Sequence, residues 1–308
     1  MKFFQSSKIK EGSTLKRCFV AFFEAGYKTA MHDGVEHAGY LSFLMLLALF
    51  PFLVVLVSIA GAFGQSEIGM EFMDLLLTNL PPNVGDALQP RIEEIVSGTP
   101  QGLMTLAIVG AIWTASSAVE GIRNILNRAY RVTTPPAFYF RRLLSIGQVI
   151  IIAFIIIIVM LLLVFFPILW KTIHEWLIQI GVDWDIINNF TFSVKWTYIV
   201  SITLLFMGVS SLYYVLPNIK QRLISVLPGA LVVVIAWLAS AMLFSMYLKR
   251  FNQVNVIYGS LGGFIVSLLF FFIINTIFIY GAELNYLLAH IFGQEIEEKE
   301  HAEEVIED

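Results

Sequence analysis

Six long runs without a charged residue constrain the fold of this chain more than any other feature of its sequence. Charges are absent from residues 37–66, 95–119, 143–170, 196–219, 223–248 and 251–282. A helix needs about 20 apolar residues to cross a bilayer core of about 30 Å, and it pairs its own backbone groups. We therefore predict an all-α polytopic membrane protein. Its six transmembrane helices are expected at about residues 38–63, 102–120, 143–170, 196–217, 223–248 and 257–282.

The composition supports a membrane protein and excludes several other classes. Of the 308 residues, 58% are hydrophobic and 14% are charged, whereas an ordinary soluble domain has about 25% charged residues. The mean hydropathy is +0.79. Cys18 is the single cysteine, so no internal disulfide can form. These values exclude a cytosolic enzyme, a disordered tail and a secreted disulfide scaffold.

The distribution of lysine and arginine predicts the orientation. Counted over alternate segments outside the expected spans, fourteen basic residues fall on one side and five on the other. Basic residues stay on the cytoplasmic side of a membrane. Both termini and the loops 120–142 and 218–222 are therefore expected inside.

Three segments are expected outside the bilayer. Residues 1–36 form a cytoplasmic segment in which 13–36 mix aromatic and basic residues, which indicates an amphipathic helix on the inner membrane surface. An ordinary cytoplasmic helix is the alternative. Residues 66–97 resemble an outer helical hairpin, and 291–308 form an acidic tail that is expected to be solvated. The amphipathic helix and the tail are also the surfaces at which a protein partner could dock.

Few residues suggest catalysis. The chain has no GxxxxGK[ST] loop for ATP phosphates. The only cluster with metal-ligand chemistry is His32, Asp33, Glu36 and His37, but its spacing matches neither HExxH nor HxxEH. We interpret this cluster as a solvated helix end. We therefore predict no catalytic residue, no cofactor and no metal site.

Polar residues gather where the second and sixth spans end on the expected cytoplasmic side. An acidic residue near an arginine at the membrane boundary is either a functional site or an ion pair that fixes packing. We favour packing and predict a pair between Glu283 and Arg123. The candidate inner polar cluster consists of Glu120, Arg123, Asn124, Asn127, Glu283 and Asn285.

A second group of candidate residues follows the fifth span on the expected outer side. Lys249 and Arg250 are basic residues on the side where the charge rule disfavours them. They therefore suggest contact with an anionic lipid headgroup, and simple anchoring in the headgroup layer is the alternative. The candidate headgroup contacts are Lys249, Arg250, Asn252, Asn255 and Tyr258.

Several motifs together resemble a known family. They are SFLMLLALFP at 42–51, NILNRAYRV at 124–132, LYYVLPN at 212–218, LPGA at 227–230, YGSLGG at 258–263 and GAELN at 281–285. Over about residues 15–290 the chain resembles the YihY/virulence factor BrkB family of bacterial inner-membrane proteins. The resemblance implies a six-helix protein of the bacterial cytoplasmic membrane, and some family members are linked to envelope lipid export and others to virulence.

The family also carries an old label, ribonuclease BN, which we reject for this chain. A two-metal nuclease needs a cluster of histidine and aspartate ligands, and an RNA-binding protein needs a basic surface. Neither is present in the sequence.

The predicted function is the translocation or handling of a lipid or a lipid-linked amphiphile of the cell envelope. An ion pump is disfavoured because no predicted span carries a charged residue near its middle. The expected partners are membrane lipids, without nucleic acid. The alternative is a non-transporting structural or regulatory membrane protein.

Overall fold

The computed structural model describes residues 14–62, 101–133, 138–155, 194–250, 260–294 and 296–299, and these are mostly helical. The helices are α1 (Thr14–Met31), α2 (Gly34–Ala62), α5 (Gln101–Ala129), α8 (Val194–Val215), α9 (Leu223–Arg250) and α11 (Ser260–Ile291). A further helix covers Phe138–Ile155. Two short strands, β1 (Ile219–Lys220) and β2 (Glu297–Glu298), form an antiparallel pair. The expected hairpin at 66–97 lies outside the described residues.

Within the described residues, three helices are long and apolar enough to cross a membrane. They are Phe138–Ile155, Leu223–Leu248 and Gly262–Ile291, and the second coincides with a predicted span. Shorter apolar helical stretches cover Gly34–Leu49 and Ile199–Val215. Helix α9 exposes large apolar side chains such as Leu231, Ile235 and Met242. Such exposure is typical of a helix that faces hydrocarbon.

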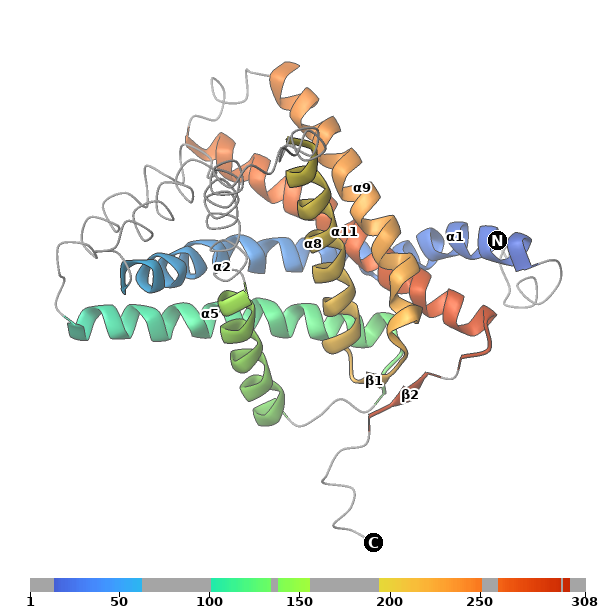
Figure 1. Ribbon diagram of the computed structural model, residues 1–308, viewed down its shortest axis with the longest axis horizontal. Coiled ribbons are helices and arrows are strands. Elements are labelled where there is room, and N and C mark those ends of the chain that lie inside the picture. Colours follow the sequence, from blue (N-terminus) through green and yellow to red (C-terminus); the bar gives the residue numbers. More distant parts are fainter. Residues whose placement is uncertain are drawn as a thin grey trace, which may run out of the picture. The chain divides into compact units, whose positions relative to one another are not determined.

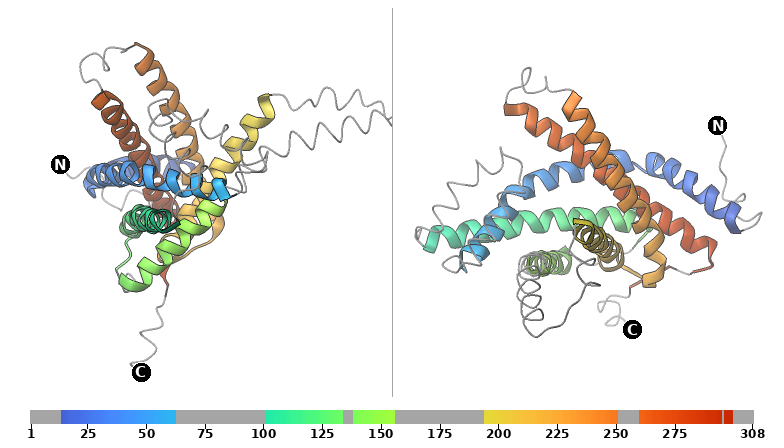
Figure 2. Two further views of the ribbon diagram at one scale, coloured as in Figure 1. Left: turned by 90° about the vertical axis from the view of Figure 1, so that its left-hand side faces the viewer. Right: turned by 45° about the horizontal axis from the view of Figure 1, so that its top comes forward.

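The described residues fall into two compact units, and the first contains the candidate inner cluster. This unit draws on residues within 1–46, 118–142 and 202–308. Its central helix is α11, which packs against α9 and against α1 (Figure 1). The right-hand view of Figure 2 shows the same crossing of α9 and α11.

Helix α1 is attached to α11 by an apolar seam. Ala21 and Ala25 are fully buried against a cluster of α11 side chains that includes Leu284 and Leu288. The Tyr280 hydroxyl donates a hydrogen bond to the carbonyl oxygen of Phe22 over 2.8 Å. One face of α1 is therefore covered by the protein itself, while Phe19, Phe23 and Tyr27 remain exposed. The position of this helix on the membrane surface stays a prediction.

The helix expected over 13–36 ends earlier than predicted. Asp33 has a positive φ of 58°, and α2 begins at Gly34. A Cβ at position 34 would collide with the backbone oxygen of Thr29, so only glycine fits this tight connection. The break gives α2 a new direction at the start of the first apolar stretch.

The acidic tail is not fully solvated, which corrects our expectation. Within the described residues 296–299, Glu298 pairs with Ile219 and Glu297 pairs with Lys220. The Glu298 carboxylate accepts hydrogen bonds of 2.7 Å from both the backbone nitrogen and the hydroxyl of Thr133. Backbone pairing and this double acceptor contact give an acidic segment partners that its composition does not indicate.

The second compact unit draws on residues within 47–117 and 143–201. In this unit, α5 buries the small residues Ala111 and Ala115 and exposes Val109 and Trp113. Small buried residues allow helices to approach closely.

Candidate functional site

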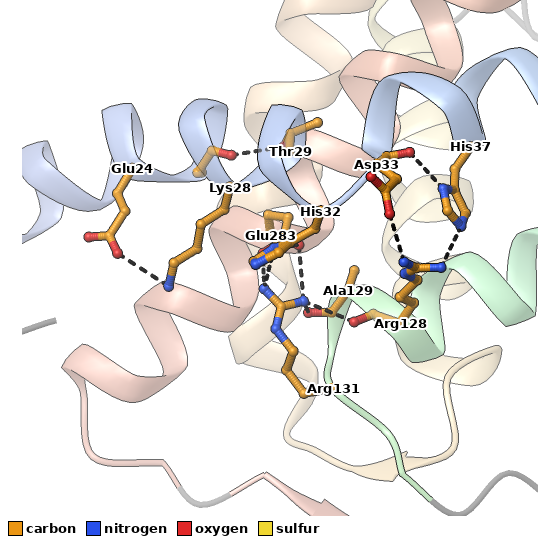
Figure 3. A network of polar contacts seen from close by, with 11 residues as sticks. Glu24, Lys28, Thr29, His32, Asp33, His37, Arg128, Ala129, Arg131 and Glu283 are labelled. Atoms are coloured by element: carbon orange, nitrogen blue, oxygen red, sulfur yellow. Dashed lines mark hydrogen bonds and ion pairs between the residues drawn. The ribbon is translucent and has the colours of Figure 1, made fainter. Parts of the chain in front are cut away.

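An ion pair between Arg131 and Glu283 lies at the centre of a polar network in the first unit (Figure 3). The Arg131 guanidinium donates two hydrogen bonds to the Glu283 carboxylate, with distances of 2.8 and 3.0 Å. The Glu283 side chain is only 2% exposed, whereas that of Arg131 is 31% exposed. These two hydrogen bonds offset the energetic cost of burying the Glu283 charge, which would otherwise have no partner.

The backbone at the end of α5 places Arg131 opposite Glu283. Arg131 has a φ of 63°. Its backbone nitrogen donates to the Arg128 oxygen over 3.1 Å, and the Val132 nitrogen donates to the Asn127 oxygen over 2.8 Å. These two bonds form a Schellman motif, in which the left-handed position is usually glycine. The chain reverses there and carries Arg131 off the helical face that sequence periodicity assigns to it.

His32 joins the same pair. Its Nδ1 lies 3.0 Å from Arg131 Nη2 and 3.4 Å from Glu283 Oε1. In one tautomer Nδ1 accepts from Arg131, and with a proton on Nδ1 it donates to Glu283. The contact that Nδ1 makes therefore depends on whether this nitrogen carries a proton.

A second pair lies beside the first but is more exposed. Arg128 Nη2 donates to Asp33 Oδ2 over 2.9 Å, and Arg128 Nη1 lies 3.2 Å from His37 Nε2. The Arg128 and Asp33 side chains are 56% and 49% exposed. His37 Nδ1 in turn lies 2.6 Å from the Asp33 backbone oxygen. The cluster that we interpreted as a solvated helix end is thus half exposed and paired with an arginine.

The described residues contain no group of three His, Cys, Asp or Glu side chains that could hold a metal ion. His32 and His37 instead contact Arg131 and Arg128, and a cation is a poor neighbour for a metal ion.

Neutral hydrogen bonds connect the other side of α11 to α9. Asn285 Oδ1 accepts from the backbone nitrogen of Gly229 over 2.7 Å, and its Nδ2 donates to the Val226 oxygen over 3.1 Å. A Cβ on Gly229 or on Gly281 would collide with the facing helix. The motifs LPGA and GAELN therefore supply a close helix contact together with its bridging side chain.

Two buried residues near the end of α5 complete this inner region. Asn127 Oδ1 accepts a hydrogen bond of 2.7 Å from the backbone nitrogen of Asn218. Tyr130 is 3% exposed. Burial raises the pKa of its phenol well above the ordinary value, and the Glu283 charge raises it further. The Tyr130 phenol is therefore neutral under ordinary conditions.

The predicted pair of Glu283 with Arg123 is wrong. Arg123 Nη1 donates to Glu120 Oε2 over 3.1 Å and to the Arg141 backbone oxygen over 2.9 Å. Arg141 also donates to Asn124 Oδ1 over 3.0 Å. The candidate cluster thus divides into an α5 group around Arg123 and separate contacts at Asn127, Glu283 and Asn285.

The candidate headgroup contacts are not placed by the structure. Lys249 and Arg250 are the last residues of α9, and their side chains are outside what the structure describes. Asn252, Asn255 and Tyr258 lie outside the described residues. Their role stays a prediction.

A crevice of about 390 Å³ lies between the first turns of α2 and the last turns of α5. Tyr40 and Ile125 give it apolar walls, and Glu36, Asn124 and Arg128 give it polar groups. The volume is within the range of small-molecule sites. The crevice could hold a molecule with a charged end and an apolar body.

Sequence reasoning missed Arg128, Arg131 and Arg141 as functional partners. The first two lie within NILNRAYRV, one of the motifs that carry the family resemblance, and this was the available signal. Their partners could not be assigned, because Arg131 lies beyond the helix end and Arg141 belongs to the next helix.

Comparisons with known proteins agree with a membrane protein. The protein family described as virulence factor BrkB matches residues 26–306 of this chain. The putative ribonuclease-like protein YfkH of Bacillus subtilis is 29% identical over 258 residues, which cover 84% of this chain and 91% of that protein. A UPF0761 membrane protein of Vibrio campbellii is 28% identical over 289 residues, covering 91% of this chain and 83% of the relative. A UPF0761 membrane protein of Histophilus somni is 27% identical over 283 residues, covering 91% and 94%. No solved structure matches.

The apolar helices and these relatives together define a helical membrane protein. The chain belongs to the virulence factor BrkB family, whose match covers most of its length. The family resemblance seen in the motifs is thus confirmed. The ribonuclease-like name belongs to the Bacillus relative, and the absence of enzymatic activity in this chain stays a prediction.

Proposed function

We propose that this protein handles or translocates a membrane lipid, with a lipid head entering the crevice between α2 and α5. The observation that carries the proposal is the pairing of apolar walls with charged groups in that crevice. Arg128 can donate hydrogen bonds to a lipid phosphate, and Glu36 can accept them from an ammonium group. Tyr40 and Ile125 offer apolar surface to the start of the acyl chains.

Helix α1 supports a position at the membrane surface. Phe19, Phe23 and Tyr27 are 66%, 57% and 49% exposed along one side of the helix. Lys16, Arg17 and Lys28 are basic residues of the same helix. Aromatic and basic residues together favour the headgroup layer of an anionic membrane. We propose that α1 lies on the cytoplasmic surface of the bacterial inner membrane.

The proposed topology has six spans with both termini inside. It rests on the six charge-free runs and on the asymmetry of basic residues. Single cysteines introduced into 66–97 and into 120–142, in a Cys18→Ala background, should react with impermeant reagents from opposite sides of the membrane. Labelling of both loops from one side would contradict the six-span arrangement.

The function is tested by reconstituting the purified chain alone into vesicles that contain a headgroup-labelled phospholipid. Wild-type protein should speed the movement of labelled lipid between leaflets over protein-free vesicles. Arg128→Gln should slow this movement by about tenfold, because a charge-assisted hydrogen bond to the phosphate is lost. Arg128→Lys is the matched control, since it keeps the positive charge and should slow the movement less than Arg128→Gln does.

Absence of lipid movement with wild-type protein would contradict the transport proposal and favour the structural or regulatory alternative. Equal movement with wild type and Arg128→Gln would remove the crevice from the lipid path.

A further inference from the structure

A second pocket, of about 620 Å³, lies where α9 begins and α11 ends. Lys220 and Arg222 line it from the turn before α9, and Ser225 lines it from the first turn of that helix. Gln294 and Ile296 line it from the chain that follows α11. The pocket shares no lining residue with the crevice between α2 and α5.

The described residues that line the pocket carry a net positive charge. Lys220 and Arg222 are both cations, and no acidic side chain is found among the described residues that line the pocket. Glu297 lies opposite Lys220 in the paired strands and offsets part of that lysine's charge. The Arg222 guanidinium is exposed and forms no hydrogen bond or ion pair with any residue that the structure describes. Its charge is therefore available to an anion.

Neutral donors and apolar surface complete the pocket. The Ser225 hydroxyl donates a hydrogen bond to Gln294 Oε1, which leaves the amide nitrogen of Gln294 as a donor. Phe292, which is 56% exposed, and Ile296 supply apolar contacts. The start of α9 adds the positive end of a helix dipole.

The position of the pocket matches the depth of lipid headgroups. The candidate span of α9 begins at Leu223 and that of α11 ends at Ile291. Lys220 and Arg222 lie just before the first of these residues, Phe292 and Gln294 lie just after the second, and Ser225 is in the first turn of the α9 span. Phosphate groups of lipids lie at the ends of transmembrane helices, outside the hydrocarbon core.

We propose that this pocket binds the phosphate of an anionic lipid, with Arg222 as the principal contact. Lys220 and the amide nitrogen of Gln294 supply further donors, and Phe292 and Ile296 contact the glycerol and the first acyl carbons. The proposal rests on the proposed function and deepens it, because it gives a lipid-handling chain a second lipid site and names an anionic phospholipid as the ligand of that site.

The proposal is tested by adding short-chain phosphatidic acid to the full-length chain in detergent. Native mass spectrometry then measures how many lipid molecules are bound to each protein. Wild-type protein should bind it, and Arg222→Gln should weaken binding by about tenfold through loss of a charge-assisted hydrogen bond. Glu297→Gln should strengthen binding by about twofold, since it removes a negative charge opposite Lys220. Arg222→Lys, which keeps the positive charge, should bind more tightly than Arg222→Gln.

Short-chain phosphatidylcholine and inorganic phosphate are the comparison ligands. Competition by inorganic phosphate as strong as by phosphatidic acid would assign the site to free phosphate and overturn the lipid assignment. Equal binding of phosphatidylcholine, or wild-type binding by Arg222→Gln, would overturn the proposed site altogether. Because binding is measured without vesicles, these outcomes are separate from lipid movement, which tests the crevice through Arg128.

Discussion

Two helices of the first unit end in the same backbone motif but carry different residues in its left-handed position. At the end of α5 this residue is Arg131, with a φ of 63°, and at the end of α11 it is Gly293, with a φ of 65°. The bonds match as well, since the Gly293 nitrogen donates to the His290 oxygen and the Gln294 nitrogen to the Ala289 oxygen. Glycine adopts this conformation without strain, whereas another residue is less stable there by about 1 kcal/mol.

The difference shows what the strained cap achieves. Arg131 reaches the buried Glu283 carboxylate, while the glycine cap has no side chain to offer. An ion pair with a 2% exposed carboxylate outweighs a strain of about 1 kcal/mol, because removing the partner would leave a buried charge. Arg131 is therefore unfavourable for the backbone conformation of this turn but provides the ion pair with Glu283.

The largest effect should follow Arg131→Ala. This variant keeps the unfavourable φ and removes the only arginine bonded to Glu283 within the described residues, so we expect a loss of about 3 kcal/mol in unfolding free energy. Equilibrium unfolding in mixed detergent micelles measures it. A further Glu283→Gln change should restore part of the loss, since the uncompensated carboxylate disappears. Fully additive losses would show that the two residues are not coupled.

Arg131→Gly should be less destabilising than Arg131→Ala. It loses the same ion pair but relieves the strain at φ 63°, so a net loss of about 2 kcal/mol is expected in the same assay. The difference between the two variants measures the strain directly. Equal stabilities would mean that the left-handed position of Arg131 costs nothing.

The glycine cap gives the next smaller effect. Gly293→Ala should cost about 1 kcal/mol, from φ strain alone, because a Cβ there would meet no atom within 4 Å. Gly208→Ala, also with open space around its Cβ but inside α8, is the matched control. Since alanine is favoured in helices, Gly208→Ala should be neutral or slightly stabilising, and a similar loss in both variants would argue against strain.

The smallest effect is expected for Arg128→Ala. Its pair with Asp33 is about half exposed on both sides, and exposed pairs contribute about 1 kcal/mol or less. The loss should shrink further as salt is added, which unfolding at several salt concentrations would measure. A loss as large as that of Arg131→Ala would show that exposure does not separate the two pairs.

Much of the helical framework could be predicted from the sequence. The run between Arg222 and Lys249 has no charge, and the structure places an apolar helix over Leu223–Leu248. Hydrophobic length alone predicts such helices, because hydrocarbon excludes unpaired backbone groups. The number of spans and their orientation rest on the charge pattern and stay predictions.

The contacts in the candidate site could not be predicted from the sequence, because they depend on local backbone geometry that helical periodicity does not reveal. The mistaken pair of Glu283 with Arg123 came from treating the end of α5 as a continuous helix, whereas Arg131 reverses the chain after Ala129. The docking of Glu298 on Thr133 was equally hidden, because two-residue strands have no sequence pattern of their own. Asn285, in contrast, was identified from the sequence as a polar residue at a span end, and it bridges α9 and α11.

The seam between α1 and α11 has a consequence for the order in which the protein is made. Ala21 and Ala25 leave the ribosome long before Leu284 and Leu288, their partners on α11. At about 5–20 residues per second, the delay is on the order of tens of seconds. During that interval the inner side of α1 must be covered by something other than its final neighbour. In a chain that stops before α11, α1 is therefore expected to lack its packing partner, even if the earlier helices insert normally.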